Sequence, residues 1–89
     1  MQKKTVTIIN KLRLHARAAA KFVQVASRFN SAINISCAGR EVSGKSIMGV
    51  MMLAAGKGVV IDIIASGADE NEAVQTIEQL IQDRFGENE

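Results

Sequence analysis

Apolar and polar residues alternate with a period of two in four stretches of the chain, and we predict each stretch to be a β-strand. The clearest is residues 59–66, where Asp62 would lie on the face opposite the core. The core face of that strand would be entirely apolar: Val59, Ile61, Ile63 and Ala65. The other predicted strands are residues 4–10, 32–38 and 41–43, with a tight turn at Gly39-Arg40.

Apolar residues at helical spacing predict three helices, at residues 16–29, 46–55 and 69–85. Ser46 would cap the second helix, Asp69 and Glu72 resemble a capping box for the third, and Gly86 would end it. The predicted core stripes are Ala19, Phe22, Val23, Ala26 and Phe29 in the first helix, Val50, Leu53 and Ala54 in the second, and Val74, Ile77, Leu80, Ile81 and Phe85 in the third.

The predicted elements follow the order β-α-β-β-α-β-α. Alternation in the strands indicates a sheet with one wet face, which antiparallel sheets often have. We therefore predict an α+β fold, an open-faced β-sandwich in which three helices lie on one face of a four-stranded antiparallel sheet. The length of 89 residues fits a single domain, residues 1–89.

Composition narrows the range of functions. The net charge is only +2, and the basic residues form no run with interleaved aromatics, so we expect no nucleic acid as partner. The longest apolar stretch, residues 50–55, is too short to cross a bilayer, and we expect no membrane insertion. The single cysteine, Cys37, cannot form an internal disulfide and is predicted to be an inert thiol on a buried strand position. These features favour the cytoplasm.

The candidate chemistry lies in residues 12–20, which contain the only histidine, His15. Arg17 follows two positions later, where the first helix is predicted to begin. The backbone N–H groups at a helix N-terminus attract anions. An imidazole, a cation and free N–H groups together suit a side chain that carries phosphate on nitrogen. A surface histidine beside a solvated arginine is the simpler alternative.

The second helix has more apolar residues than a small core can cover. Some of Ile47, Met48, Met51 and Met52 must be exposed, and an exposed apolar patch in a soluble protein usually marks a contact site. The alternative is a core that wraps most of the helix. Near His15, the small side chains of Ala16 and Ala20 would let a partner come close.

Residues 39–46 also fit the nucleotide-binding pattern G-x-x-x-x-G-K-[ST], with Lys45 and Ser46 at its end. We discount this match, because the strand before it alternates whereas the strand before a P-loop is continuously apolar. The predicted hairpin also turns residues 39–43 into a turn and a strand. Finally, the chain has too few βαβ units for a parallel sheet.

The sequence around His15 resembles a known family. Residues 11–18, Lys-Leu-Arg-Leu-His-Ala-Arg-Ala, are similar to the Gly-Leu-His-x-Arg-Pro motif of HPr, the histidine-containing phosphocarrier of the bacterial sugar phosphotransferase system. Residues 44–48, Gly-Lys-Ser-Ile-Met, resemble the second motif of that family. The resemblance covers nearly the whole chain.

The resemblance implies that Nδ1 of His15 accepts a phosphoryl group from enzyme I and passes it to an enzyme IIA domain, with Arg17 stabilising the phosphate. It implies a carrier rather than an enzyme, without metal or cofactor, and we expect a monomer. In some members a dedicated HPr kinase phosphorylates Ser46. The implied docking surface consists of Ala16, Arg17, Ala20, Ile47, Met48, Met51 and Met52.

The chain departs from the family motif at two positions. Arg13 replaces the usual Gly, and it would carry about 1–2 kcal/mol of strain if the backbone there has positive φ. Ala18 replaces the usual Pro, which would cost about 0.4–1 kcal/mol of stability through the unfolded state. Both changes leave His15 and Arg17 in place. Three alternatives stay open: a carrier in a paralogous nitrogen-type regulatory relay, a regulatory module that binds through the methionines, and the P-loop nucleotide binder.

Overall fold

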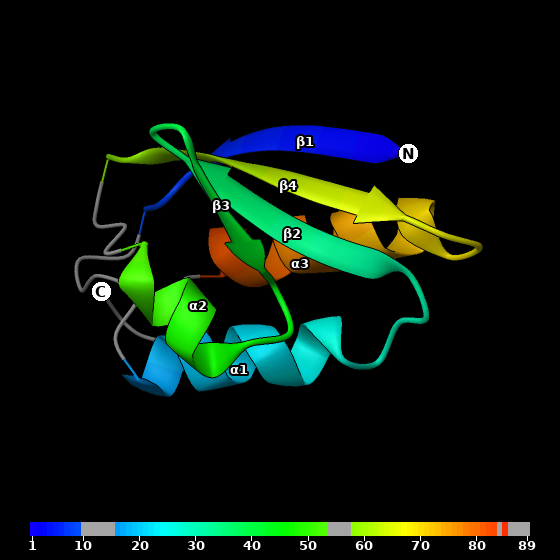
Figure 1. Ribbon diagram of the computed structural model, residues 1–89, viewed down its shortest axis with the longest axis horizontal. Coiled ribbons are helices and arrows are strands. Elements are labelled where there is room, and N and C mark those ends of the chain that lie inside the picture. Colours follow the sequence, from blue (N-terminus) through cyan, green and yellow to red (C-terminus); the bar gives the residue numbers. More distant parts are fainter. Residues whose placement is uncertain (10–15, 54–57, 84, 86–89) are drawn as a thin grey trace.

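The computed structural model describes residues 1–9, 16–53, 58–83 and 85. The elements come in the predicted order of strands and helices (Figure 1). They are β1 (Gln2–Thr7), α1 (Ala16–Ala26), β2 (Ala32–Cys37), β3 (Arg40–Ser43), α2 (Ile47–Met52), β4 (Val60–Ser66) and α3 (Glu70–Gln82).

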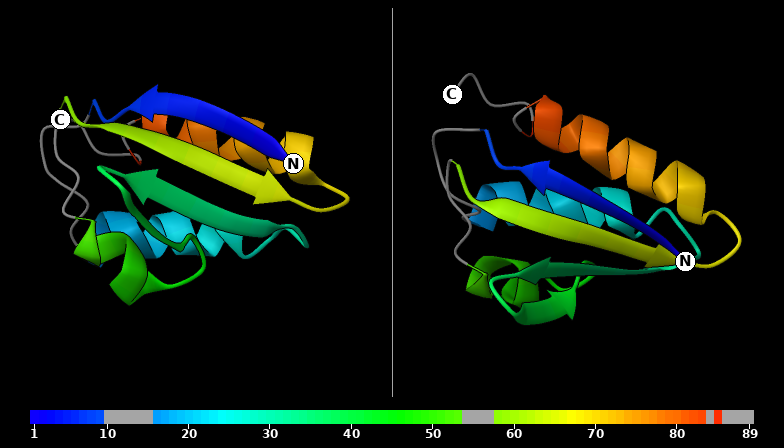
Figure 2. Two further views of the ribbon diagram at one scale, coloured as in Figure 1. Left: turned by 45° about the horizontal axis from the view of Figure 1, so that its top comes forward. Right: turned by 90° about the horizontal axis from the view of Figure 1, so that it is seen from above.

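The four strands form one sheet in the order β1-β4-β2-β3, and every neighbouring pair is antiparallel. β4 and β2 are the central strands, with Ile63 of β4 opposite Ile35 of β2. The helices cover one face of this sheet (Figure 2). The predicted α+β open-faced sandwich is confirmed.

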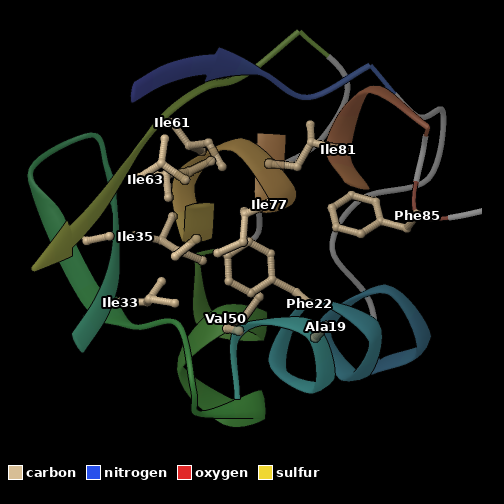
Figure 3. Packing of buried hydrophobic residues seen from close by; sticks show 14 of the residues in the cluster. Ala19, Phe22, Ile33, Ile35, Val50, Ile61, Ile63, Ile77, Ile81 and Phe85 are labelled. Carbon is tan, nitrogen blue, oxygen red and sulfur yellow. The ribbon is translucent and has the colours of Figure 1, made fainter. Parts of the chain in front are cut away.

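The core lies between the sheet and the helices, and Phe22 is at its centre. Its ring lies between Ile77 of α3 and Val50 of α2 (Figure 3). These three side chains are fully buried, as are Ile61, Ile63 and Ala65 of β4, as the alternation predicted. Burial of such side chains contributes about 1.5–3 kcal/mol each. Ala18 and Ala73, which were not predicted as core residues, are also buried.

The other face of the sheet is mostly polar, although Val60 of β4 is 53% exposed there. Thr5 of β1 lies opposite Asp62 of β4, and its Oγ1 donates to Asp62 Oδ1 at 2.6 Å. Lys3 Nζ is 3.7 Å from Asp62 Oδ2. Toward the other edge of the sheet, Asn34 Nδ2 of β2 donates to Glu41 Oε2 of β3 at 2.8 Å. Exposed pairs of this kind stabilise a sheet only weakly, but they keep the face solvated.

The turn between β2 and β3 lies one residue earlier than predicted. Cys37 pairs with Arg40, so the two turn residues are Ala38 and Gly39, with φ of 52° and 84°. A two-residue hairpin of this type needs positive φ at both central positions, and only the second is glycine here. The predicted Gly39-Arg40 turn is therefore wrong. Cys37 packs against the core but is only partly buried, which also corrects its predicted burial.

The predicted capping box at the start of α3 is wrong as well. Asp69 precedes α3 but makes no side-chain cap bond. Its carboxylate instead accepts hydrogen bonds from Asn30 N and Ser31 N, both at 2.9 Å, and from Ser31 Oγ. The Ser31 hydroxyl and the Asn30 amide hold the pKa of Asp69 below its ordinary value. Asp69 thus joins the start of α3 to the segment after α1, while Glu72 is exposed.

Glu70 makes one local and one distant contact at this helix end. Its carboxylate accepts from Gly67 N at 3.1 Å and lies 2.8 Å from the amino group of Met1. Both contacts lower the pKa of Glu70, the amino group of Met1 most. Because negative charge is favoured in the first turn of a helix, Glu70 also stabilises α3 through its position.

Helices α1 and α3 end three residues earlier than predicted. α1 stops at Ala26 and α3 at Gln82, yet Phe29 and Phe85 beyond them are buried as expected. Phe85 has a φ of 56°, so the chain has left the helix while its ring stays in the core. Several predicted positions lie outside the described residues: Asn10, Ala54 and Gly86. No helix in the described ranges is long and apolar enough to span a membrane.

Candidate functional site

The N-terminal end of α1 is the first part of the candidate site. α1 begins at Ala16, and Arg17 lies exposed in its first turn. His15, the residue before Ala16 in the sequence, lies outside the described residues, as does Arg13. The first N–H groups of a helix have no carbonyl partner within the helix, and the helix dipole adds positive potential there. This end of α1 therefore favours an anion.

Alanines fix how α1 lies on the sheet. Ala18 and Ala19 are fully buried, while Ala16 and Ala20 are exposed as predicted. Ala18 replaces the proline of the family motif, and its methyl group belongs to the core. The burial of Ala18 was missed because the predicted stripe began one residue later. With small side chains on both faces of its first turns, α1 is closely packed inside and accessible outside.

Ser46 caps α2, as predicted. Its Oγ accepts a hydrogen bond from Gly49 N at 3.1 Å, and its carbonyl accepts from Val50 N at 3.0 Å. The backbone of Ser46 is extended, with a φ of −118°, which is typical of an N-cap residue. Ser46 is partly buried. Removal of an N-cap side chain typically costs about 1 kcal/mol of stability.

α2 exposes most of its apolar side chains. It buries one residue, Val50, and Leu53 after it is partly buried. The exposed residues form the second part of the candidate site, which we call the methionine patch: Ile47, Met48, Met51 and Met52. Met48 is 70% exposed and Met52 59% exposed. The predicted exposed apolar patch is confirmed.

Contacts that the sequence did not reveal tie both ends of α2 to the rest of the fold. Arg40 Nη1 donates to the carbonyl of Met52 at 3.1 Å, and Lys45 Nζ donates to the carbonyl of Phe29 at 2.7 Å. A helix of six residues is unstable alone, so its position depends on such contacts. The charge of Arg40 at the C-terminal end of α2 also suits the helix dipole. No sequence signal identifies these partners, because both bonds join segments distant in the chain.

The structure of residues 39–46 argues against a P-loop. Residues 40–43 form strand β3, so they cannot cradle a phosphate. Lys45, the residue that would reach the phosphates, is bonded to Phe29. Gly44 packs so closely that an added Cβ would lie 2.8 Å from Ile33 Cγ2 and 3.1 Å from Phe22 Cε1. The glycine of the motif thus serves core packing.

The two parts of the site are neighbours. α1 packs against α2, and the start of α1 lies at the same end of the molecule as the end of α2 (Figure 1). The charged residues that precede Glu41 in the sequence are all basic, and they include Arg17 and Lys21 of α1 and Arg40 of β3. Lys21 Nζ donates to the carbonyl of Phe85 at 2.8 Å. The arrangement combines an anion-attracting helix end with an apolar patch and basic neighbours.

A hollow among the described residues lies apart from the candidate site. A hollow of about 400 Å³ lies between α1 and α3. Neither Arg17 nor the methionine patch contributes to its lining. The lining residues are Val25, Gln75, Thr76, Gln79, Leu80 and Asp83. The described ranges contain no group of His, Cys, Asp and Glu side chains that could hold a metal ion. The hollow is thus separate from the methionine patch and from Arg17.

Comparison with known families decides the membership of the chain. The family model described as "PTS HPr component phosphorylation site" matches residues 2–83. The chain belongs to the HPr family. The phosphocarrier protein HPr of Neisseria meningitidis serogroup A is 53% identical over 89 residues and aligns over 100% of both chains. HPr of Cupriavidus necator gives the same identity and coverage.

Solved structures of HPr proteins have the same fold. The crystal structure of HPr from Thermoanaerobacter tengcongensis matches with a TM-score of 0.95 and 45% identity, covering 100% of each chain. The Bacillus subtilis catabolite repression protein Crh is 40% identical and matches with a TM-score of 0.76 over 94% of this chain and 97% of its own. Its crystal structure is a domain-swapped dimer. The resemblance drawn from residues 11–18 and 44–48 is therefore confirmed at the level of family and fold.

Proposed function

We propose that this chain is a phosphocarrier of the phosphotransferase system, which accepts a phosphoryl group on His15 from phospho-enzyme I and passes it to an enzyme IIA domain. The observation that carries the proposal is the match of residues 2–83 to a family defined by its phosphorylation site. The place of Ala16 and Arg17 in the first described turn of α1 supports it, because the N-terminal end of a helix attracts anions and His15 is the preceding residue in the sequence. The carrier turns over only with its partner enzymes and is not itself an enzyme.

In this mechanism Nδ1 of His15 attacks the phosphorus atom of the enzyme I phosphohistidine, whose P–N bond breaks as the new P–N bond forms. Arg17 and the first N–H groups of α1 neutralise charge on the phosphoryl oxygens through charge-assisted hydrogen bonds. Such stabilisation must stay moderate, because the phosphoryl group has to leave again. An exposed Arg17 in a solvated first turn fits that requirement better than a buried ion pair.

The methionine patch, with Ala16, Arg17 and Ala20, is the proposed docking surface for enzyme I and the IIA domain. Flexible methionine side chains suit a carrier that binds two different partners in turn. Basic residues beside the patch favour acidic partner surfaces and faster association at low salt. Phosphorylation of Ser46 by an HPr kinase is a further part of this proposal, since about two negative charges would lie beside an apolar docking surface.

A regulatory binding module is the second candidate function. It is favoured by one observation: Ser46, the N-cap of α2, lies beside the methionine patch, and neither feature requires a histidine. A carrier in a nitrogen-type regulatory relay would use the same residues as the sugar carrier and differ only in its partners. For all of these we propose a cytoplasmic monomer that needs no cofactor, and size-exclusion chromatography with light scattering tests the monomer.

The first experiment is intact-mass spectrometry after incubation with phosphoenolpyruvate and enzyme I from the same organism. We expect the wild type to gain one phosphate that is lost in acid, and the His15→Ala variant to gain none. Arg17→Ala should slow the transfer by about 10- to 100-fold, because a hydrogen bond to a charged group contributes about 1.5–3 kcal/mol and about 1.4 kcal/mol corresponds to tenfold in rate. Arg28→Ala is the matched control, because Arg28 lies beyond the other end of α1.

A folded wild type that gains no phosphate from its cognate enzyme I would overturn the carrier and leave the regulatory module. Equal labelling of His15→Ala would move the acceptor to another residue. Binding of ATP that depends on Lys45 would revive the P-loop, which the Lys45–Phe29 contact argues against. Transfer to individual IIA domains then separates the sugar branch from the regulatory branch.

A further inference from the structure

Every methionine of this chain is on the surface. The chain has four, and Met1 is 79% exposed while the three of α2 are 70% (Met48), 36% (Met51) and 59% (Met52) exposed. The buried core of the described residues contains isoleucine, valine, alanine and phenylalanine but no methionine. Methionine commonly fills irregular gaps in cores. Here its thioethers are instead concentrated where solvent reaches them.

Solvent-exposed thioethers are the ones that oxidants reach. Three of them lie within five residues of one short helix, on the surface proposed for docking. Cys37, the other oxidisable sulfur, is partly buried in β2 and is not part of the patch. The patch is therefore the most accessible group of oxidisable sulfurs in the described residues.

We propose that Met48, Met51 and Met52 are sites of reversible oxidation by peroxides, and that their oxidation weakens docking of the phosphoryl donor and acceptor. This inference rests on the proposed function, because it assigns a regulation to the proposed docking surface. It does not require phosphorylation of Ser46.

The reaction needs only the peroxide. A lone pair of the thioether sulfur attacks one peroxide oxygen, a sulfur–oxygen bond forms and the oxygen–oxygen bond breaks. The other oxygen leaves as water with both protons of hydrogen peroxide. The sulfur loses two electrons and the peroxide gains them. Methionine sulfoxide reductases return the sulfoxide to the thioether at the expense of thiols.

The geometry directs the effect to docking rather than to folding. The bonds that hold α2 use its backbone: Ser46 Oγ accepts from Gly49 N, and Arg40 donates to the carbonyl of Met52. Val50, the buried residue of α2, cannot be oxidised in this way. A sulfoxide oxygen on the exposed side chains leaves these contacts intact. On docking, however, that polar oxygen must lose its water against an apolar partner surface.

The test treats purified protein with hydrogen peroxide, follows the oxygen atoms gained by peptide mass spectrometry, and measures phosphoryl acceptance from enzyme I. A Cys37→Ala background removes the competing thiol. We expect the KM for the oxidised carrier to rise about tenfold with kcat unchanged, since the sulfoxides weaken binding and leave the imidazole of the acceptor chemically unaltered. The reductase should restore the original KM. Met48→Gln, a polar residue of similar length, should raise KM about threefold without peroxide.

The matched control is the triple variant Met48→Leu, Met51→Leu, Met52→Leu, in which Met1 remains oxidisable. Its KM should not change with peroxide, and circular dichroism should show the same fold for both proteins before and after treatment. Sulfoxides at all three positions with an unchanged KM would overturn the inference, as would an equal rise in the triple variant. Failure of the untreated protein to accept phosphate would overturn the proposed function and this inference with it.

Discussion

Helices α2 and α3 pack on the same face of the sheet but differ in how they are used. α3 has 13 residues and buries Ala73, Val74, Ile77 and Ile81. α2 has six residues, buries Val50 alone and exposes the methionine patch. At the start of α3, the Asp69 side chain accepts a hydrogen bond from Ser31 N. Just after α3, the carbonyl of Phe85 accepts one from the Lys21 side chain. α3 thus supplies stability, while α2 keeps apolar surface available for a partner.

The largest expected effect is a loss of stability when a buried side chain of α3 is truncated, compared with truncation of an exposed side chain of α2. Ile77 is fully buried against Phe22 in Figure 3, so Ile77→Ala should lower the free energy of unfolding by about 2–5 kcal/mol. Met48→Ala, on the exposed face of α2, should change it by less than about 0.5 kcal/mol. Urea unfolding measures both. Comparable losses in the two variants would show that α2 contributes to the core as much as α3 does.

The second prediction concerns pH and the start of α3. The pKa of Asp69 is lowered in the folded protein, chiefly by the Ser31 hydroxyl, so its ionised form stabilises the fold. That contribution is complete above the ordinary aspartate pKa of about 3.9 and is lost as pH falls through the lower pKa of the folded state. Asp69→Asn should destabilise the protein at pH 7, by less than Ile77→Ala, and flatten the loss of stability in acid.

Urea unfolding at a series of pH values checks this prediction. Glu72→Gln is the control, since Glu72 is an exposed carboxylate in the first turn of the same helix. If both variants show the same acid profile, the carboxylate–Ser31 contact makes no special contribution and the anchoring of α3 must be attributed to its apolar stripe.

The third prediction separates stability from docking at Ser46. Ser46→Ala removes the cap to Gly49 N and should lower stability by about 1 kcal/mol, with little change in docking. Ser46→Asp keeps a capping oxygen and adds charge at the helix N-terminus, so stability should hold. Its KM toward enzyme I should rise, because the charge lies beside the methionine patch.

Unfolding in urea and the phosphoryl-transfer assay are run on both variants. Equal KM values for Ser46→Ala and Ser46→Asp would contradict a charge effect on docking. A loss of stability in Ser46→Asp would mean that the aspartate does not replace the hydroxyl as a cap.

The sequence predicts best those features that depend on residues close together in the chain. Strand alternation at 59–66 placed Ile61, Ile63 and Ala65 in the core, because side chains on a pleated strand must alternate between faces. The N-cap role of Ser46 was predictable for the same reason, since it involves Gly49 three residues away. The exposed methionine patch followed from a count of apolar residues that exceeds what one face of a short helix can bury.

Features that depend on distant contacts could not be predicted. Asp69 has the local pattern of a capping box, yet the amides of Asn30 and Ser31, brought close by the fold, offer its carboxylate more hydrogen bonds. The bond from Arg40 to Met52 crosses from a strand to a helix and leaves no trace in the local pattern. The role proposed for His15 rests on the family and on the sequence, because His15 lies outside the described residues.

The smallest expected effect concerns the hairpin that leads to α2. Ala38 has a φ of 52°, a left-handed conformation that costs a residue with a Cβ about 1–2 kcal/mol. Asparagine tolerates this conformation better, and Asn-Gly is the preferred pair for this two-residue turn. Ala38→Asn should therefore raise the free energy of unfolding by about 0.5–1 kcal/mol. Ala32→Asn, at an exposed position in β2, is the control and should not stabilise.

Because Arg40 follows this turn and bonds to Met52, Ala38→Asn should also slow hydrogen exchange in α2 more than in α3. Equal slowing in both helices would mean that the hairpin stabilises the whole fold and not α2 in particular.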